Sequence, residues 1–508
     1  MPQIDSGLFA QMRTAMPEGA CAFLRTADAR DISYADMLAR SGQFANCLTA
    51  AGLRTGDRLA VQVEKSAEAL LLYLACLRVG AIFLPLNPSY VPAEMEYFLD
   101  DAGPACVVVA PEKESAIATI AKRGSSTLLT LGNDGRTGSV IGRARNMPED
   151  FRDVARAPDD VAAILYTSGT TGRPKGAMLS QDNLASNALA LRDLWRFSRA
   201  DVLLHALPLY HTHGLFTATN TMLMAGASMI LLPKFDVGEV LACLPQATAM
   251  MGVPTFYTRL LEDPRLTRGK AAHMRLFVCG SAPLLPETHR TWLARTGHAI
   301  VERYGMTETN MIASNPYDGE RIAGTVGLPL PGVEIRIADP EGGAALPAGR
   351  IGMIELRGPN VFKGYWRKAD QTKSAFREDG FFITGDLGKI DAFGVLHIVG
   401  RAKDLVISGG LNIYPREIEA EIDTVAGVVE SAVIGVPHSD FGEAVTAIVV
   451  RSEGSTLREA DVLAALSSRL ANFKLPKRVL FADELPRSAM GKVQKNVLRD
   501  RHRTLYCS

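Results

Sequence analysis

At 508 residues and 54.7 kDa, the chain exceeds what one hydrophobic core usually serves, so two or three domains are expected. Basic (Lys, Arg) and acidic (Asp, Glu) residues both number 55, and this balance excludes a surface built for bulk nucleic-acid binding or for anionic membranes. An apolar fraction of 47% excludes a disordered chain, and seven scattered cysteines without a C-x-x-C pair exclude a disulfide scaffold.

Helical and β-rich patterns alternate along the first part of the chain. Helical patterns cover residues 34–51, 67–78 and 94–102, and β-rich runs cover 58–63, 81–86 and 105–110. Strands separated by helices of about a dozen residues predict βαβ units and a parallel sheet. The rhythm recurs with strands at 228–232 and 276–279. The uncharged segment 215–233 is predicted to be helix, turn and strand rather than a membrane span, because an AGA break interrupts it.

The pattern changes near residue 332, where short strands alternate with Gly/Pro turns and indicate a small antiparallel barrel or sheet. Beyond residue 400, helices and strands form a compact α+β unit, and residues 132–159 have a loop-like composition. The predicted fold class is α/β: a large N-terminal body of layered α/β subdomains with a small β-barrel-like part, and a mobile small α+β C-terminal domain. The predicted division is residues 1–400, a hinge at 401–404, and residues 405–508.

The ends of the chain show no secretory, peroxisomal or prenylation pattern. The apolar run at 69–77 is stopped by Arg78 and is too short to span a bilayer. We therefore expect a cytoplasmic protein without stable membrane association, as a monomer or small homo-oligomer.

The most informative segment is YTSGTTGRPKG at residues 166–176, which follows an apolar strand and precedes an amphipathic helix. Glycines let the backbone approach a polyphosphate closely, backbone N–H groups cradle its oxygens, and a lysine adds charge. The spacing does not fit the Walker pattern. The alternative is a generic flexible Ser/Gly turn.

This segment resembles the phosphate loop of the adenylate-forming enzymes, a superfamily of acyl-CoA synthetases, peptide-synthetase adenylation domains and luciferases. Further segments resemble its other motifs in the same order: ALPLYHTHGL (206–215), YGMTET (304–309), TGDLG (384–388), GRAKDLVISGGLNIYPREIE (400–419) and LPRSAMGKVQK (485–495). The resemblance covers essentially the whole chain. It implies a two-step ligation, in which a carboxylate attacks the α-phosphate of ATP and a thiol, usually that of coenzyme A, then displaces AMP.

The resemblance also implies roles for individual residues. Lys492 would bridge the substrate carboxylate and the α-phosphate, Thr307 would hydrogen-bond that phosphate, and Glu308 would ligate Mg²⁺, a hard cation that prefers carboxylate and phosphate oxygens. Asp386 would accept both ribose hydroxyls, and Arg401 would hold the ribose from the domain boundary. The full set of expected ATP contacts is Thr167, Ser168, Gly169, Thr170, Thr171, Gly172, Lys175, Gly280, Ser281, Ala282, Glu302, Tyr304, Gly305, Asp386 and Arg401.

The segment at 400–419 resembles the hinge and thioester-forming loop of the superfamily. Lys403 matches the position at which the C-terminal domain pivots between the two half-reactions. Gly409 and Gly410 resemble the backbone that meets the pantetheine arm of coenzyme A, and they lack a Cβ that would prevent that approach. The alternative for these glycines is a plain turn.

The acid substrate is predicted from a charge in the pocket. Arg303 adjoins the YGMTET motif, and an unpaired buried guanidinium predicts an anionic partner, such as a second carboxylate on the substrate. Arg259 is the second candidate cation and His211 a further ligand, whereas His213 is expected to be structural. In the alternatives, Arg303 pairs with Glu302 or another acid, and Arg259 lies on a helix surface.

These pocket segments resemble the malonyl-CoA synthetases, and malonate is the shortest acid with a second carboxylate near the reacting one. The resemblance therefore implies an enzyme that joins malonate to coenzyme A with ATP and Mg²⁺, and methylmalonate is a further possible substrate. The alternatives are the same chemistry on another small acid, an adenylation enzyme that loads a carrier protein, and a luciferase-like oxidase. The charged pocket argues against the last, because a large aromatic substrate needs an apolar slot.

Overall fold

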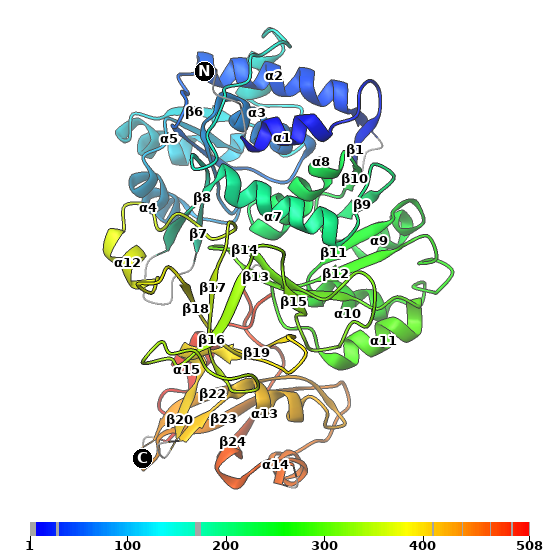
Figure 1. Cartoon of the computed structure of the whole chain (residues 1–508), viewed down its shortest axis with the longest axis vertical. Coiled ribbons are helices and arrows are strands. Elements are labelled where there is room, and N and C mark those ends of the chain that lie inside the picture. The colour runs from blue at the N-terminus through cyan, green and yellow to red at the C-terminus, as the bar shows by residue number, and fades with distance from the viewer. Residues whose placement is uncertain are drawn as a thin grey trace.

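The computed structural model describes residues 7–26, 30–167, 174–408, 411–438, 440–467, 469–488 and 491–506. Two mostly parallel sheets lie beside each other in one part of the molecule, a small antiparallel sheet follows along the long axis, and a C-terminal α+β unit lies at the far end (Figure 1). None of the described helices has the length and apolarity needed to cross a bilayer.

The first sheet confirms the predicted βαβ units. Its strand order is β6 (Thr127–Thr130), β5 (Cys106–Val109), β3 (Arg58–Gln62), β4 (Ile82–Pro85), β7 (Val161–Thr167) and β8 (Lys175–Ser180), and only β8 is antiparallel to its neighbour. Helix α3 (Ala67–Val79) is buried on every side, which explains its continuous apolar sequence. Ser66 caps its first turn and Gly80, at φ 73°, ends it in the left-handed conformation that glycine adopts without strain.

The second sheet carries most of the site described below. Its order is β15 (Leu328–Pro329), β14 (Asn310–Ser314), β13 (Val301–Met306), β12 (Leu276–Cys279), β11 (Ala249–Gly252), β9 (Val202–His205), β10 (Ser228–Leu231), β1 (Ala22–Thr26) and β2 (Asp31–Ser33). The six strands from β13 to β1 are parallel to their neighbours. The predicted helix, turn and strand at 215–233 are present, but the helix begins as a π-helix, η2 (His213–Asn220), and continues as α8 (Thr221–Ala225).

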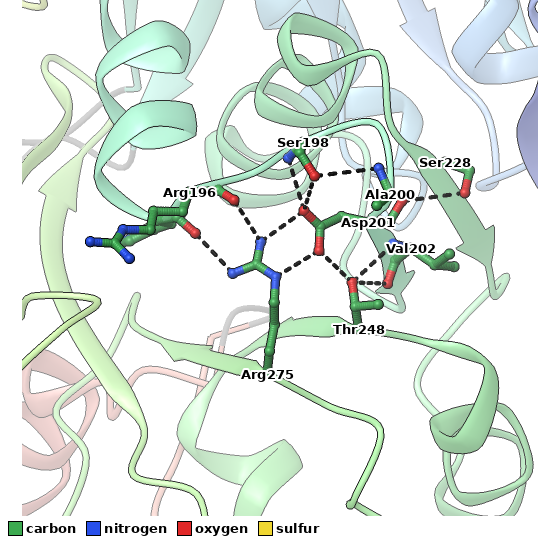
Figure 2. Close-up of polar contacts among 9 residues, drawn as sticks. Arg196, Ser198, Ala200, Asp201, Val202, Ser228, Thr248 and Arg275 are labelled. Atoms are coloured by element: carbon green, nitrogen blue, oxygen red, sulfur yellow. Dashed lines mark hydrogen bonds and ion pairs between the residues drawn. The ribbon is translucent and has the colours of Figure 1, made fainter.

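An ion pair fixes the amino-terminal ends of three neighbouring strands of this sheet (Figure 2). The carboxylate of Asp201, just before β9, accepts hydrogen bonds from Arg275 Nε at 2.6 Å and Nη2 at 2.9 Å, just before β12. Thr248 Oγ1, just before β11, donates to the same carboxylate at 2.8 Å. Arg275 also donates to the carbonyl of Trp195 at 3.0 Å, after α7 (Gln181–Leu194). The register of β9, β11 and β12 is therefore set at one edge, while their carboxyl ends stay free for the site.

The remaining strands form two smaller sheets. The antiparallel sheet β16 (Glu334–Ala338), β17 (Gly352–Arg357), β18 (Phe382–Ile390), β19 (Leu396–Arg401) is open rather than a closed barrel. The C-terminal sheet is β21 (Leu411–Ile413), β20 (Val406–Ser408), β23 (Gly442–Arg451), β22 (Val428–His438), with β24 (Arg478–Ala482) beside β23. A short 3₁₀ turn, η4 (Ala402–Asp404), separates β19 from β20, so the strands on its two sides belong to different sheets. The division at 401–404 stays a prediction.

The other helices cover these sheets or connect them. They are α1 (Leu8–Ala15), α2 (Tyr34–Ala50), α4 (Pro92–Ala102), α5 (Glu114–Arg123), α6 (Ser139–Ala144), α9 (Val237–Cys243), α10 (Pro254–Glu262), α11 (Pro286–Thr296), α12 (Ala369–Ser374), α13 (Pro415–Ile422), α14 (Glu459–Ser467) and α15 (Lys495–His502), with 3₁₀ turns η1 (Pro111–Lys113), η3 (Leu244–Gln246) and η5 (Asn472–Lys474). Helix α6 lies inside the segment 132–159, which the sequence predicts to be a loop. The largest core spans the first two sheets, and the C-terminal unit has cores of its own.

Candidate active site

The candidate site lies where the parallel strands β9, β11, β12 and β13 end. Side chains at the carboxyl ends of neighbouring parallel strands converge on one edge of a sheet, which is where open α/β sheets bind their ligands. The segments that converge here are residues 205–215 after β9, the loop 280–284 after β12, and β13 with the turn that follows it.

Arg303 and Glu302 point to opposite faces of β13, because side chains alternate along a strand. The Glu302 carboxylate interacts with His289 Nδ1 at 3.2 Å and accepts from the backbone N–H of Gly324 at 3.0 Å. It is therefore engaged away from Arg303, and the predicted alternative of an Arg303–Glu302 pair is wrong. The structure also does not bring the Glu302 carboxylate to the other expected ATP contacts.

The guanidinium of Arg303 is buried, at 4% exposure, and its Nε and Nη2 atoms have no hydrogen-bond partner among the described residues. It packs directly on Gly280: a Cβ there would lie 2.4 Å from the guanidinium carbon, so any larger residue would displace the guanidinium. Burial lowers the pKa of Arg303 to about 10, although Cys279 and Tyr257 nearby partly offset this effect. A buried cation with free donors is the feature that sequence reasoning anticipated.

The structure separates the other candidates for the acid pocket. Arg259 lies near the end of α10 and is exposed, which matches the helix-surface alternative. His211 is half-buried, and burial together with Lys492 and Arg303 lowers its pKa to about 3, so it is neutral. His213, expected to be structural, is fully buried, and its Nε2 atom has no partner among the described residues. Burial and the charge of Arg303 lower the pKa of His213 far below its usual range.

A second cluster surrounds Asp386 on β18. Its carboxylate accepts from Tyr304 Oη at 2.5 Å and pairs with Arg401 Nε at 2.7 Å. Its backbone N–H donates to Thr384 Oγ1 at 3.0 Å. Each carboxylate oxygen receives one of these side chains and keeps a second lone pair, so the group can accept further hydroxyl hydrogens. The TGDLG motif and Tyr304 are thus brought together as predicted.

Glu308 follows β13 and is buried, at 6% exposure. Burial raises the pKa of its carboxyl group, whereas a hydrogen bond from Tyr365 Oη, at 3.0 Å to Oε1, lowers it. Lys175 lies over the ring of the same tyrosine, with Nζ 4.9 Å from the ring centre. Sequence reasoning missed Tyr365, which links the lysine of the phosphate-loop motif to Glu308. Thr307, beside Glu308, is half-buried.

The turn after β13 depends on Gly305. A Cβ at this position would lie 2.0 Å from the carbonyl oxygen of Asn310, because β13 and β14 approach closely here. Asn310 has φ 50°, and its side chain accepts a hydrogen bond from Thr212 at 2.8 Å. Ser281, after Gly280, also adopts a left-handed φ of 71°, and such strained residues concentrate at functional sites. Ala282 beside it is half-buried.

Lys492 reaches the site from the C-terminal unit. A hairpin carries it, closed by hydrogen bonds from Ser488 N to Lys492 O and from Gln494 N to Pro486 O. Lys492 is solvent-accessible, yet it is surrounded closely enough for burial and Arg401 to lower its pKa to about 8, with Arg303 acting in the same direction. It is exposed and lies near both clusters, because the charges of Arg303, Asp386 and Arg401 all act on it.

Some predicted residues cannot be placed. Ser168, Gly169, Thr170, Thr171 and Gly172 of the phosphate loop, and Gly409 and Gly410, lie outside the described residues. Thr167 and Lys175 pair across β7 and β8 at the two ends of that loop. Lys403 lies in η4, and its carbonyl accepts from Arg499 Nη1 at 3.2 Å, while Arg499 Nη2 pairs with Asp404 at 2.6 Å.

Comparison with known proteins defines the class. Residues 10–366 match the model of the AMP-binding enzymes, and residues 417–492 match that of the AMP-binding enzyme C-terminal domain. The chain belongs to the AMP-binding enzyme family, whose members adenylate their substrates, and the predicted fold is confirmed.

Individual members of the family are similar to this chain over most of its length. The chain is 37% identical to a feruloyl-CoA synthase of Amycolatopsis sp. over 92% of this chain and 94% of that protein. It is 35% identical to a malonate–CoA ligase of Arabidopsis thaliana, over 88% and 78%. The ATP-bound crystal structure of MatB from Rhodopseudomonas palustris is 59% identical, with a TM-score of 0.97 over 99% of this chain and 100% of that one.

The apo structure of the same MatB, at equal identity and coverage, gives a TM-score of 0.87. Both are structures of the same MatB protein, so the difference between the two TM-scores reflects a difference in conformation between them. The overall arrangement of this chain is therefore more similar to the ATP-bound structure of that protein than to its apo structure.

Proposed function

We propose that this protein ligates malonate to coenzyme A in two steps, through a malonyl-adenylate, with release of pyrophosphate and then AMP. The observation that carries the choice of acid is the buried guanidinium of Arg303, whose Nε and Nη2 donors have no partner among the described residues. These two N–H groups form the side-on fork that binds a carboxylate through two parallel hydrogen bonds. A dicarboxylate offers such a group at its distal end.

In the first step, the proximal carboxylate of malonate attacks the α-phosphorus of ATP and pyrophosphate leaves. Two anions must meet, so the reaction needs electrostatic stabilisation more than proton transfer. Lys492 and Thr307 are the proposed contacts of the α-phosphate. Asp386, already oriented by Tyr304 and Arg401, is proposed to hold the ribose.

Mg²⁺ is the implied metal, and Glu308 fits it. Mg²⁺ is typically held by one or two carboxylates together with substrate phosphates. Glu308 offers one buried carboxylate, with the hydroxyl of Tyr365 orienting Oε1. When bound, the ion would neutralise charge on the phosphates of ATP. The surrounding residues orient the carboxylate and exclude water from it.

In the second step, the thiolate of coenzyme A attacks the malonyl carbonyl carbon and AMP leaves with the bonding electrons. A mostly apolar cavity of about 260 Å³ adjoins the segment 206–215 and is a suitable path for the pantetheine arm. Leu215, Tyr210 and Phe256 are among the residues that line it, together with the ionisable side chains of Glu64, Lys65 and Lys234. We propose that the C-terminal domain pivots at Lys403 between the two steps and so presents a different face to the site in each step.

Malonate is favoured over the aromatic acids of other relatives by charge. The feruloyl-CoA synthase and indoleacetate–CoA ligase relatives are named for aromatic monocarboxylates, which would leave the Arg303 guanidinium buried without an anion. Malonate–CoA ligases of Arabidopsis thaliana and Mus musculus are among the relatives at 35% identity. Another small dicarboxylate, or a carrier protein in place of coenzyme A, is the second candidate.

The test is ATP–pyrophosphate exchange with acetate, butyrate, benzoate, malonate, methylmalonate and succinate, followed by thiol consumption with coenzyme A. Wild type is expected to exchange with malonate and to consume the thiol, and Arg303→Met is expected to lose exchange. Arg290→Met is the matched control, because Arg290 is exposed and paired with Glu287. Exchange with a monocarboxylate and none with malonate would refute the dicarboxylate assignment.

A further inference from the structure

His213 combines complete burial with an unpartnered nitrogen beside the acid pocket. Its Nδ1 atom lies 3.2 Å from Ser281 Oγ, in the loop that also supplies Gly280 beneath Arg303. Its Nε2 atom has no hydrogen-bond partner among the described residues, and its side chain is 0% exposed. A buried polar atom without a partner costs about 1–3 kcal/mol, and a ligand that pairs with this nitrogen would recover that cost.

The backbone that presents His213 is held by a buried lysine. Lys65 Nζ lies 2.9 Å from His205 Nδ1 and donates to the carbonyl of His205 at 2.8 Å. With Nδ1 accepting from the lysine, the other ring nitrogen carries the hydrogen and donates to the carbonyl of Gly214 at 2.9 Å. Gly214 belongs to the first turn of η2, directly after His213. This hydrogen bond fixes the π-helical start of η2, and π-turns are frequent at functional sites.

Three buried side-chain nitrogens at this pocket have no hydrogen-bond partner among the described residues. Arg303 contributes Nε and Nη2, and His213 contributes Nε2, all three without partners among the described residues. Because burial and the charge of Arg303 both lower the pKa of His213, the imidazole is neutral and one nitrogen carries the hydrogen. The contact between Ser281 Oγ and His213 Nδ1 fits either tautomer; when the Ser281 hydroxyl donates to Nδ1, the hydrogen of the imidazole lies on Nε2.

We propose that His213 Nε2 donates a hydrogen bond to the distal carboxylate of the acid, and that it completes with Arg303 a three-donor pocket specific for dicarboxylates. This inference rests on the proposed function. It replaces Arg259, which is exposed on α10, by a neutral donor as the second anchor. A monocarboxylate would leave all three donors unsatisfied, so the pocket discriminates by hydrogen bonding as well as by charge.

The test compares His213→Leu, which removes the donor, with His213→Gln, whose amide nitrogen can occupy the position of Nε2. Loss of one hydrogen bond to a charged group predicts a rise of about 10–100-fold in KM for malonate in His213→Leu, with KM for ATP changed less than twofold. His213→Gln is expected to recover a large part of the affinity. His273→Leu, at an exposed histidine, is the matched control and should equal wild type.

The outcomes separate this inference from the proposed function. Wild type that fails to exchange with malonate refutes the function. Wild type that uses malonate, with variants whose KM for malonate is unchanged or rises in parallel with KM for ATP, refutes the role of His213 alone. If His213→Leu does not fold, His213→Asn replaces it: its shorter amide reaches only the Nδ1 position, so its KM for malonate should exceed that of His213→Gln, and equal values would refute the proposal.

Discussion

Replacing Arg303 by methionine should increase the stability of the ligand-free protein while it removes the activity. At pH 7 the guanidinium is charged in both the folded and unfolded states, so the cost of burying it is fully present. That cost is relieved only above pH 10, where the folded protein begins to lose the proton. Lowering the pKa from the usual arginine value to about 10 corresponds, at 1.36 kcal/mol per pH unit, to roughly 3 kcal/mol.

Methionine has a similar length and no charge, and its packing loss offsets part of this gain. Replacing buried charges by apolar groups of similar volume stabilises proteins by up to about 1–4 kcal/mol, so we expect about 1–3 kcal/mol for Arg303→Met in urea unfolding at pH 7. The Arg290→Met control should lie within about 0.5 kcal/mol of wild type, because its partner pair is exposed.

The second part of the experiment measures how much bound malonate stabilises each protein against urea. At about 100 times its dissociation constant, it should stabilise wild type by about 2.7 kcal/mol and leave Arg303→Met unchanged. A variant destabilised by 2 kcal/mol or more, as a simple core truncation would be, or one that malonate stabilises as it does wild type, would show that Arg303 is a packing residue rather than an anion anchor.

Three further predictions concern the other clusters. Burial and neighbouring cations lower the pKa of Lys492 to about 8, so kcat/KM for pyrophosphate exchange should fall as the pH rises through 8, and Lys492→Arg should move this limb to higher pH; an unchanged limb would assign it to another group. Tyr365→Phe should raise the Mg²⁺ concentration needed for half-maximal exchange about tenfold, since Glu308 loses its orienting bond, and an unaltered requirement would exclude this role. Arg275→Leu should cost about 3 kcal/mol in urea unfolding, because it leaves Asp201 buried without its cation; a loss below 1 kcal/mol would contradict the assigned importance of this pair.

The layered fold could be predicted because local patterns decide it. Strands at 228–231 and 276–279 and helix α3 follow from apolar runs bounded by turn residues. The placement of Glu302 could also be predicted. Because side chains alternate along β13, Glu302 must point away from the pocket if Arg303 faces it. The π-helical start of η2 was not predictable, since over eight residues no periodicity distinguishes it from an α-helix.

Residues whose roles depend on contacts distant in the sequence were the ones that sequence reasoning missed or misassigned. Tyr365 meets Glu308 across 57 positions, and nothing in either segment links the two. Arg259 and Tyr257 share one helix, and the sequence does not say that the tyrosine is buried near Arg303 whereas the arginine is exposed. A positive charge near a motif was therefore a weaker predictor than the burial of the group that carries it.

The electrostatics of the site explain how a chain without net charge can recruit three anionic reagents. Arg303, Arg401 and Lys492 lie close enough for two of them to lower the pKa of the third, and only Arg401 has a carboxylate partner of its own, Asp386, among the described contacts. Their mutual repulsion raises the free energy of the empty site, and each bound anion relieves part of it. Part of the binding energy for the acid and the nucleotide thus comes from the repulsion between these cations in the empty site. Substitutions that remove such a cation should therefore weaken substrate binding and increase the stability of the fold.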